Sequence, residues 1–303
     1  MRRRTWLTAI AAAAWFTDVL PKANRSVLLP FEHSAFPYSG NIPDSDRPFL
    51  DAVDNGRLGH TTSRGGVYFQ DDRYSDPQSL MHWSHKLRSH QPGCLVIFFH
   101  GNNATLYDDV IVRQQLPSQF DASHLHGALF APQLARNALD SSAGRFWEPQ
   151  FFAEYLKEAE HNLARSTGIP ERNLTRWPVV IMAYSGGYNP AAYSLEIGGA
   201  GDRIKGVILM DALFGELPRF YNWIAHKPKY SFFVSAYSEV LRKEHGDMRA
   251  SLKQGGISVN MQRPTNLRNG GVWFIDCGRV GHMEFMSQAW VKNPVRWILS
   301  RMH

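Results

Sequence analysis

The chain has 303 residues, of which 44% are hydrophobic and 20% are charged, a balance typical of a soluble globular protein with a large core. Its formal net charge of +6 would suit a nucleic-acid-binding protein, but Arg2, Arg3 and Arg4 supply three of these charges. Because no other run is rich in Lys and Arg, the sequence argues against nucleic-acid binding.

The N-terminus has the pattern of an export signal. The three arginines precede an apolar stretch over residues 5–16, which is as long as the core of a signal peptide and too short for a transmembrane helix. The paired arginines are also similar to a twin-arginine signal, which implies a bacterial source. We therefore predict an export signal over residues 1–23, no stable membrane span in the mature chain, and a periplasmic or secreted protein. The cleavage site stays open.

The remaining residues, 24–303, are expected to form a single α/β domain. Residues 24–90 are rich in Pro, Gly, Asp and Ser and should hold early strands near 26–29 and 67–70 within loops. Farther along, buried strands alternate with helices, which predicts a mostly parallel central sheet with helices on both faces. The strands are expected at 94–99, 127–131, 178–184, 204–210, 230–236 and 271–276, and the helices at 107–116, 149–167, from 189, 239–254 and at the C-terminus.

Cysteine and histidine usage indicates no metal site. The only two cysteines, Cys94 and Cys277, should lie at opposite edges of the sheet, so we predict two buried thiols rather than a disulfide. No cysteine–histidine spacing suggests zinc, and the 13 histidines are scattered. We expect neither a metal nor a cofactor.

The segment around Ser185 is the strongest functional signal. The strand at 178–184 ends at this serine, which Gly186 and Gly187 follow. A sharp strand-to-helix turn needs small residues because the backbones crowd there, as in the nucleophile-elbow motif G-x-S-x-G. This chain reads A-x-S-G-G, with Ala183 in the place of the first glycine. The same residues would also suit an ordinary Ser-Gly turn, so the motif needs its context.

That context comes from polar residues at other strand ends. The strand at 94–99 runs into His100-Gly101-Asn102, the strand at 204–210 into Asp211, and His282 follows the strand at 271–276. Parallel strands end at one edge of a sheet, so these residues should meet there. The order Ser, acid, His is that of α/β-hydrolases. On these residues the chain resembles the α/β-hydrolase superfamily over roughly 90–300, and is similar to uncharacterised bacterial hydrolases.

The resemblance implies a serine hydrolase that cleaves an ester or amide through an acyl-enzyme on Ser185, with His282 as general base. It also implies that backbone N–H groups of Asn102 and Gly186 stabilise the oxyanion. For the acid we favour Asp211, because a short side chain directly at a strand end is easily held rigid, and Glu239 is the alternative one strand later.

Two further side chains near the predicted site are assigned other roles. Asp276 lies too close to His282 in the chain to be the first choice of acid. We expect His100 to pack beneath the oxyanion loop rather than to transfer protons.

The substrate is less well specified. We expect a small-molecule or cell-envelope acyl compound, with Tyr184, Arg145 and Trp147 as candidate contacts near the catalytic edge. Two alternatives remain open: an acyltransferase that uses the same triad, and a non-catalytic binding module on the same fold.

Overall fold

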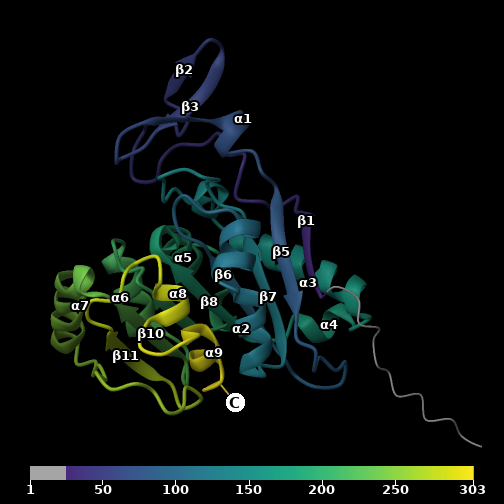
Figure 1. Ribbon diagram of the computed structural model, residues 1–303, viewed down its shortest axis with the longest axis vertical. Coiled ribbons are helices and arrows are strands. Elements are labelled where there is room, and N and C mark those ends of the chain that lie inside the picture. Colours follow the sequence, from purple (N-terminus) through teal and green to yellow (C-terminus); the bar gives the residue numbers. More distant parts are fainter. Residues whose placement is uncertain (1–24, 303) are drawn as a thin grey trace, which may run out of the picture.

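The computed structural model describes residues 25–302, so the predicted export signal lies outside the described residues. An eight-stranded sheet crosses the middle of the molecule, and a small three-stranded sheet projects beyond one edge of it (Figure 1). The large sheet has the order β1-β5-β7-β6-β8-β9-β10-β11. Its strands are β1 (Ser26–Pro30), β5 (Gln78–Trp83), β6 (Cys94–Phe99), β7 (Gly127–Pro132), β8 (Val179–Tyr184), β9 (Ile204–Met210), β10 (Phe232–Tyr237) and β11 (Gly271–Asp276).

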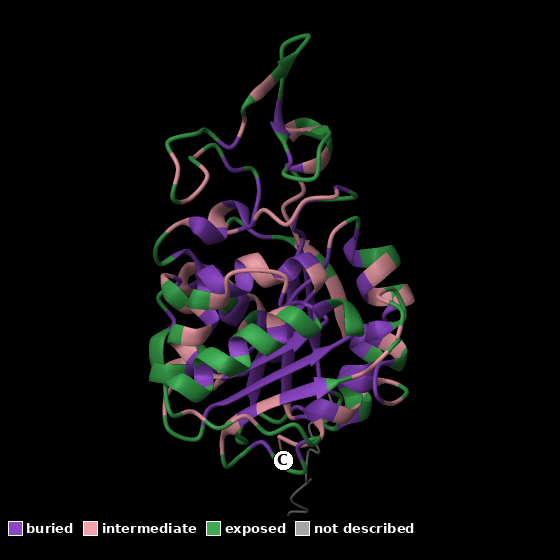
Figure 2. Cartoon of the chain, turned by 90° about the vertical axis from the view of Figure 1, so that its left-hand side faces the viewer, coloured by how far each residue is buried: buried purple, intermediate pink, exposed green. Residues whose placement is uncertain are grey.

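The large sheet is mostly parallel, as the sequence predicts. Every neighbouring pair from β7 to β11 is parallel, whereas β5 runs antiparallel to both of its neighbours. All residues of β6, β7, β8 and β10 are buried, and helices with exposed outer faces cover the sheet (Figure 2). Burial on both sides explains why these strands read as continuous apolar runs instead of alternating ones.

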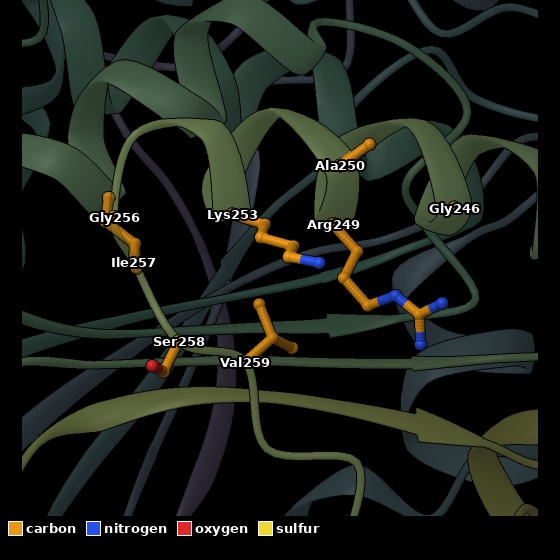
Figure 3. Close-up of a pocket in the computed structure, with 8 residues that line it drawn as sticks. All are labelled: Gly246, Arg249, Ala250, Lys253, Gly256, Ile257, Ser258 and Val259. Carbon is orange, nitrogen blue, oxygen red and sulfur yellow. The ribbon is translucent and has the colours of Figure 1, made fainter.

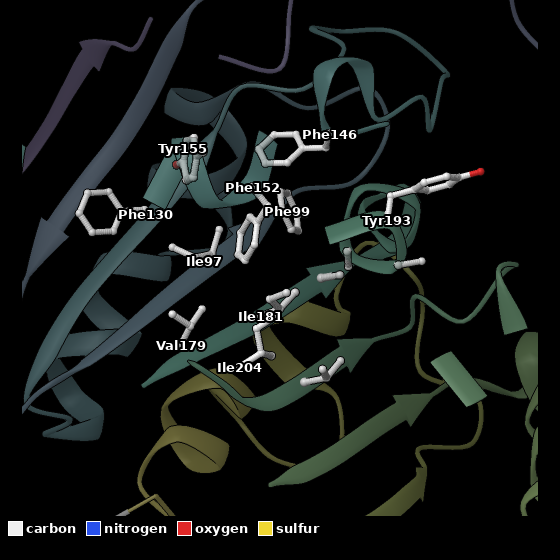
Figure 4. Packing of buried hydrophobic residues seen from close by; sticks show 14 of the residues in the cluster. Ile97, Phe99, Phe130, Phe146, Phe152, Tyr155, Val179, Ile181, Tyr193 and Ile204 are labelled. Atoms are coloured by element: carbon white, nitrogen blue, oxygen red, sulfur yellow. The ribbon is translucent and has the colours of Figure 1, made fainter. Parts of the chain in front are cut away.

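Two hydrophobic clusters occupy the two faces of the sheet. Successive side chains of a strand point to opposite faces, so Ile97 and Phe99 belong to one cluster and Val96 and Phe98 to the other. Figure 4 shows the first cluster. It packs against α3 (Phe151–Thr167), α5 (Tyr188–Glu196), α6 (Leu217–His226) and α7 (Arg242–Gln254), and the second against η1 (Leu106–Arg113), α2 (Leu116–Ser123), α8 (Phe285–Gln288) and α9 (Pro294–Leu299).

The N-terminal part holds more regular structure than the sequence indicates. The small sheet consists of β2 (Ala52–Asp54), β3 (Arg57–Thr61) and β4 (Val67–Phe69), followed by α1 (Gln70–Arg73). We call residues 49–74 the arm. The Phe49 ring at its base stacks on His60 at 4.2 Å between ring centroids and packs edge-on against Tyr74 and Trp147. This aromatic cluster packs the base of the arm against the rest of the molecule, which we call the body.

Strand β5 is not predicted from the sequence, because polar residues interrupt its apolar pattern. Ser79 and His82 are nevertheless buried. The Ser79 hydroxyl donates to the Ala131 carbonyl at 3.1 Å, and His82 Nδ1 lies 2.8 Å from the Ser26 hydroxyl. These bonds satisfy the Ser79 hydroxyl and His82 Nδ1, and His82 Nε2 lies 3.4 Å from Asp121 Oδ1, so the strand is buried without an apolar sequence.

Three local predictions need correction. The helix expected at 107–116 is the π-helix η1, which ends at Arg113, and a further helix that was not expected, α2, begins after a break at Leu116. Helix α6 was not expected. Cys94 is a buried free thiol as predicted, whereas the free thiol Cys277 is only partly buried because it follows the end of β11. Between residues 25 and 302, no helix is both long and apolar enough to cross a bilayer.

Candidate active site

Ser185 lies in a crowded turn between β8 and α5. Its φ of +53° is left-handed, a conformation that is unusual for a residue other than glycine. A Cβ atom on Gly187 would overlap the carbonyl oxygen of Phe99, and one on Gly101 would lie 2.7 Å from the Ser185 Cβ. The two glycines therefore allow the chain to turn sharply at the edge of the sheet, while Ala183 fits, fully buried, within β8.

Three of the predicted side chains form one hydrogen-bonded chain. Ser185 Oγ lies 2.8 Å from His282 Nε2, and His282 Nδ1 lies 2.6 Å from Asp211 Oδ2. An ionised carboxylate can only accept, so Nδ1 carries the ring proton. Nε2 then presents its lone pair, and the Ser185 hydroxyl donates to it. The histidine is thus in the tautomer that a general base requires.

The Asp211 carboxylate is buried and fully hydrogen-bonded. Besides His282, it accepts the Ser238 backbone N–H at 2.8 Å and the Ser238 hydroxyl at 3.1 Å. Burial by itself raises the pKa of Asp211, but the hydrogen bonds outweigh it and hold this pKa below its ordinary value. The carboxylate therefore stays ionised at neutral pH. Ser238 was not among the predicted site residues, although its position directly after β10, at the same edge of the sheet as Asp211, could have indicated it.

His282 is held from two sides. The Tyr184 hydroxyl donates to the His282 carbonyl at 2.7 Å, and its ring stacks on the imidazole at 5.0 Å between centroids with an interplanar angle of 22°. Burial raises the pKa of Tyr184 to about 12, so the phenol stays protonated and can donate. The Phe214 ring meets the imidazole edge-on at 5.9 Å. Despite these contacts, 38% of the His282 side chain is exposed, which leaves it open to a substrate.

The other carboxylates considered for this site lie elsewhere. Glu239 is exposed, and its carboxylate is 3.5 Å from Arg279. Asp276 pairs with Arg242 at 2.9 Å. The structure therefore brings Asp211 to His282 and brings neither of the other two.

His100 lies beneath the loop that carries Asn102, as expected. Its Nε2 accepts the Leu134 N–H at 2.9 Å, so Nδ1 carries the proton and donates to the Gly101 carbonyl at 2.8 Å. Burial lowers the pKa of His100 to about 4, which keeps the ring neutral at neutral pH. Its contacts fix the loop, and both ring nitrogens are occupied.

The two segments predicted to supply oxyanion donors touch each other next to Ser185. A Cβ atom on Gly186 would overlap Asn102 Oδ1, so no side chain fits between the residues. The Ser141 hydroxyl donates to the same Oδ1 at 3.1 Å and so orients the Asn102 side chain.

The three candidate substrate contacts have different surroundings. Trp147 lines a cavity of about 380 Å³ between the arm and the body. Arg145 does not line it: its guanidinium donates to the Glu32 carbonyl at 3.0 Å and lies over the Phe151 ring. Tyr184 supports His282 instead.

A second cavity, of about 690 Å³, lies along α7 and the segment 256–259 (Figure 3). It is larger than the cavity beneath the arm, but none of the predicted site residues line it. Its size therefore does not make it the reaction site.

Comparisons with known proteins find similar solved structures at low sequence identity. No protein-family model and no curated protein matches the sequence. Among solved structures, an S-formylglutathione hydrolase from Agrobacterium tumefaciens is 12% identical with a TM-score of 0.49, over 83% of this chain and 98% of that one. A feruloyl esterase module from Clostridium thermocellum is 11% identical with a TM-score of 0.47, over 88% and 94%.

An uncharacterised protein from Capnocytophaga ochracea is also similar, at 11% identity with a TM-score of 0.46 over 91% of this chain. The chain spans only 62% of that protein's length. Similarity at these levels concerns the fold alone. In this chain the strand order, the antiparallel β5 and the sharp turn after β8 are those of an α/β-hydrolase fold.

Proposed function

We propose that the protein is a serine hydrolase that cleaves an ester or amide through an acyl-enzyme on Ser185. The observation that carries the proposal is the unbroken hydrogen-bond chain from Ser185 through His282 to Asp211. A serine hydroxyl is a weak nucleophile at neutral pH and needs an adjacent base held in the correct tautomer. The hydrogen bonds of His282 to Ser185 and Asp211 support this role for His282 and an orienting role for Asp211.

In the first half of the reaction, Ser185 Oγ attacks the carbonyl carbon while His282 Nε2 takes the hydroxyl proton. Asp211 stabilises the imidazolium that forms. The carbonyl oxygen becomes an oxyanion, for which the backbone N–H groups of Gly186 and Asn102 are the proposed donors. When the tetrahedral intermediate collapses, the bond to the leaving alcohol or amine breaks and His282 returns the proton to it.

In the second half, water replaces the leaving group. His282 accepts a proton from the water as its oxygen attacks the acyl carbon of the ester on Ser185. Collapse of the second intermediate releases the acid, and the proton on Nε2 returns to Ser185 Oγ. The partial exposure of His282 supports access of water to this position.

Labelling with a fluorophosphonate tests the proposal, because this reagent phosphonylates an activated serine. We expect wild-type protein to be labelled, Ser185→Ala not at all, and His282→Ala far more slowly. Ser251→Ala and His226→Ala, which change exposed residues on α7 and α6, are matched controls and should label normally. The proposal is wrong if wild-type protein with a folded circular-dichroism spectrum is not labelled, or if labelling persists in Ser185→Ala.

We also propose that the protein is exported, on the sequence of residues 1–23 alone. Replacing Arg3 and Arg4 together by lysine should retain the precursor in the cytoplasm if the twin-arginine route is used. Immunoblots of periplasmic and cytoplasmic fractions measure this, and unchanged periplasmic protein would contradict that route.

A further inference from the structure

The cavity beneath the arm begins one side chain away from the proposed oxyanion donors. Ser141 lines it, and the Ser141 hydroxyl also bonds Asn102 and would lie 2.7 Å from a Cβ on Gly186. Tyr188, in the first turn of α5, forms another part of the lining, and its ring packs near Phe214. The cavity therefore adjoins the turn that carries Ser185.

The cavity carries two guanidinium groups that the fold does not use. Arg47, on the loop before the arm, and Arg64, on the turn between β3 and β4, both line it. Within residues 25–302, neither side chain makes a hydrogen bond or an ion pair. Both have exposed surface, so a ligand can reach them.

The carboxylates in the lining are, by contrast, committed to the fold. Asp140 accepts the Tyr74 hydroxyl at 3.0 Å and the Ser142 backbone N–H at 3.1 Å. Asp51 accepts the Thr61 N–H at 2.7 Å. Each carboxylate thus accepts at least one hydrogen bond from the protein, whereas the two guanidinium groups make none within residues 25–302. Arg47 and Arg64 are therefore the unpaired charged donors in the described lining.

The segment that carries Arg64 is well ordered by its own contacts. In the turn, the Thr62 N–H donates to the Gly66 carbonyl at 3.1 Å, and the Thr62 hydroxyl donates to the Gly65 carbonyl at 2.9 Å. Gly65 and Gly66 have φ values of +85° and +90°, which glycine adopts without strain. The aromatic cluster around Phe49 holds the base of the arm, so the turn keeps its place above the cavity.

We propose that this cavity binds a carboxylate group of the substrate, and that the guanidinium groups of Arg47 and Arg64 donate hydrogen bonds to this carboxylate. The proposal rests on the proposed function, since it concerns the ester or amide cleaved at Ser185. Guanidinium groups bind carboxylates through paired N–H donors, which suits two unpartnered arginines at one cavity. The substrate class is thus an ester or amide that carries a free carboxylate.

Matched esters test this inference. One pair carries the charge on the acyl side: p-nitrophenyl hydrogen adipate against p-nitrophenyl hexanoate. The other pair carries the charge on the alcohol side: O-acetyl lactate against methyl O-acetyl lactate, in which the carboxylate is masked as a methyl ester. Release of acetate is measured for both. We expect the wild type to show a higher kcat/KM for the charged member of at least one pair. In Arg47→Gln/Arg64→Gln that preference should fall by about tenfold or more, mainly through KM, as for a lost charged hydrogen bond.

Arg57→Gln is the matched control, because Arg57 lies on the arm outside the cavity and pairs with Asp71. This variant should keep the wild-type preference, and added salt should weaken binding of the charged ester only. The inference is overturned if neither charged ester is preferred, if an acetylated neutral sugar is preferred instead, or if the double variant keeps the preference. Fluorophosphonate labelling of each variant separates this failure from failure of the proposed function, since labelling of Ser185 needs no carboxylate.

Discussion

Replacing Asp211 with asparagine should nearly abolish turnover without unfolding the protein. The Ser238 backbone N–H donates to Asp211 Oδ1, so the amide oxygen of an asparagine would occupy that position. Its NH2 group would then face His282 Nδ1, where the Oδ2 atom now accepts at 2.6 Å. The amide would donate to Nδ1 and move the ring proton to Nε2, which could no longer accept the proton of Ser185.

The expected loss follows from this change of tautomer. A serine triad whose histidine is held in the wrong tautomer loses about 10⁴ in kcat, or about 5.4 kcal/mol of transition-state stabilisation. The assay is kcat/KM for a p-nitrophenyl ester near neutral pH, with the melting temperature as a check on folding. Glu239→Gln is the matched control and should retain activity within about twofold, since its carboxylate contacts only surface arginines. Activity of Asp211→Asn within about tenfold of wild type, or a full loss in Glu239→Gln, would refute the reasoning.

Three further results are expected. Tyr184→Phe removes the hydrogen bond to the His282 carbonyl but keeps the ring that stacks on the imidazole. We expect kcat to fall by about tenfold at an unchanged melting temperature. An unchanged kcat would contradict a role of the Tyr184 hydroxyl in positioning His282. Gly187→Ala places a methyl group against the main chain of β6 and should cost about 3 kcal/mol in urea unfolding, whereas Gly246→Ala, which meets open space within α7, should not destabilise. His100 is neutral in the folded protein down to a pKa of about 4 but binds a proton below 6.5 once unfolded. Its contribution to stability is therefore lost as pH falls from 6.5 to 4, by about 1 kcal/mol per pH unit, and His100→Gln should remove that part of the slope.

The sequence predicts the sheet and the nucleophile region because both depend on local patterns. Buried parallel strands are apolar throughout, and the turn at Ser185 needs the small residues that follow it. The acid is harder to predict, since Asp211 and Glu239 follow the adjacent strands β9 and β10 at the same edge. Which of them faces His282 depends on side-chain direction, and the strand pattern does not contain that information.

The arm could be predicted only in part, for a different physical reason: the sequence predicts a strand near 67–70, where β4 lies, but neither β2 nor β3. Its strands are three to five residues long and largely exposed, so they bury too little surface to create a periodic apolar pattern. Its position depends on contacts between residues distant in the chain, such as Phe49 with Trp147 and Tyr74 with Asp140. Arg47 and Arg64 look like ordinary loop arginines until these contacts place them on one cavity.

The structure also explains why β10 need not supply the acid. The residue that follows this strand is Ser238, and both its N–H and its hydroxyl donate to Asp211. Asp211 itself has a left-handed φ of +48°, and its own N–H donates to the Ala236 carbonyl in β10 at 2.8 Å. The carboxylate thus follows β9, and the hydrogen bonds that fix its direction come from Ser238 at the end of β10. These bonds also keep the buried carboxylate ionised. A carboxylate one strand later would lack these donors, because the Glu239 side chain already lies beyond Ser238 among arginines on the surface.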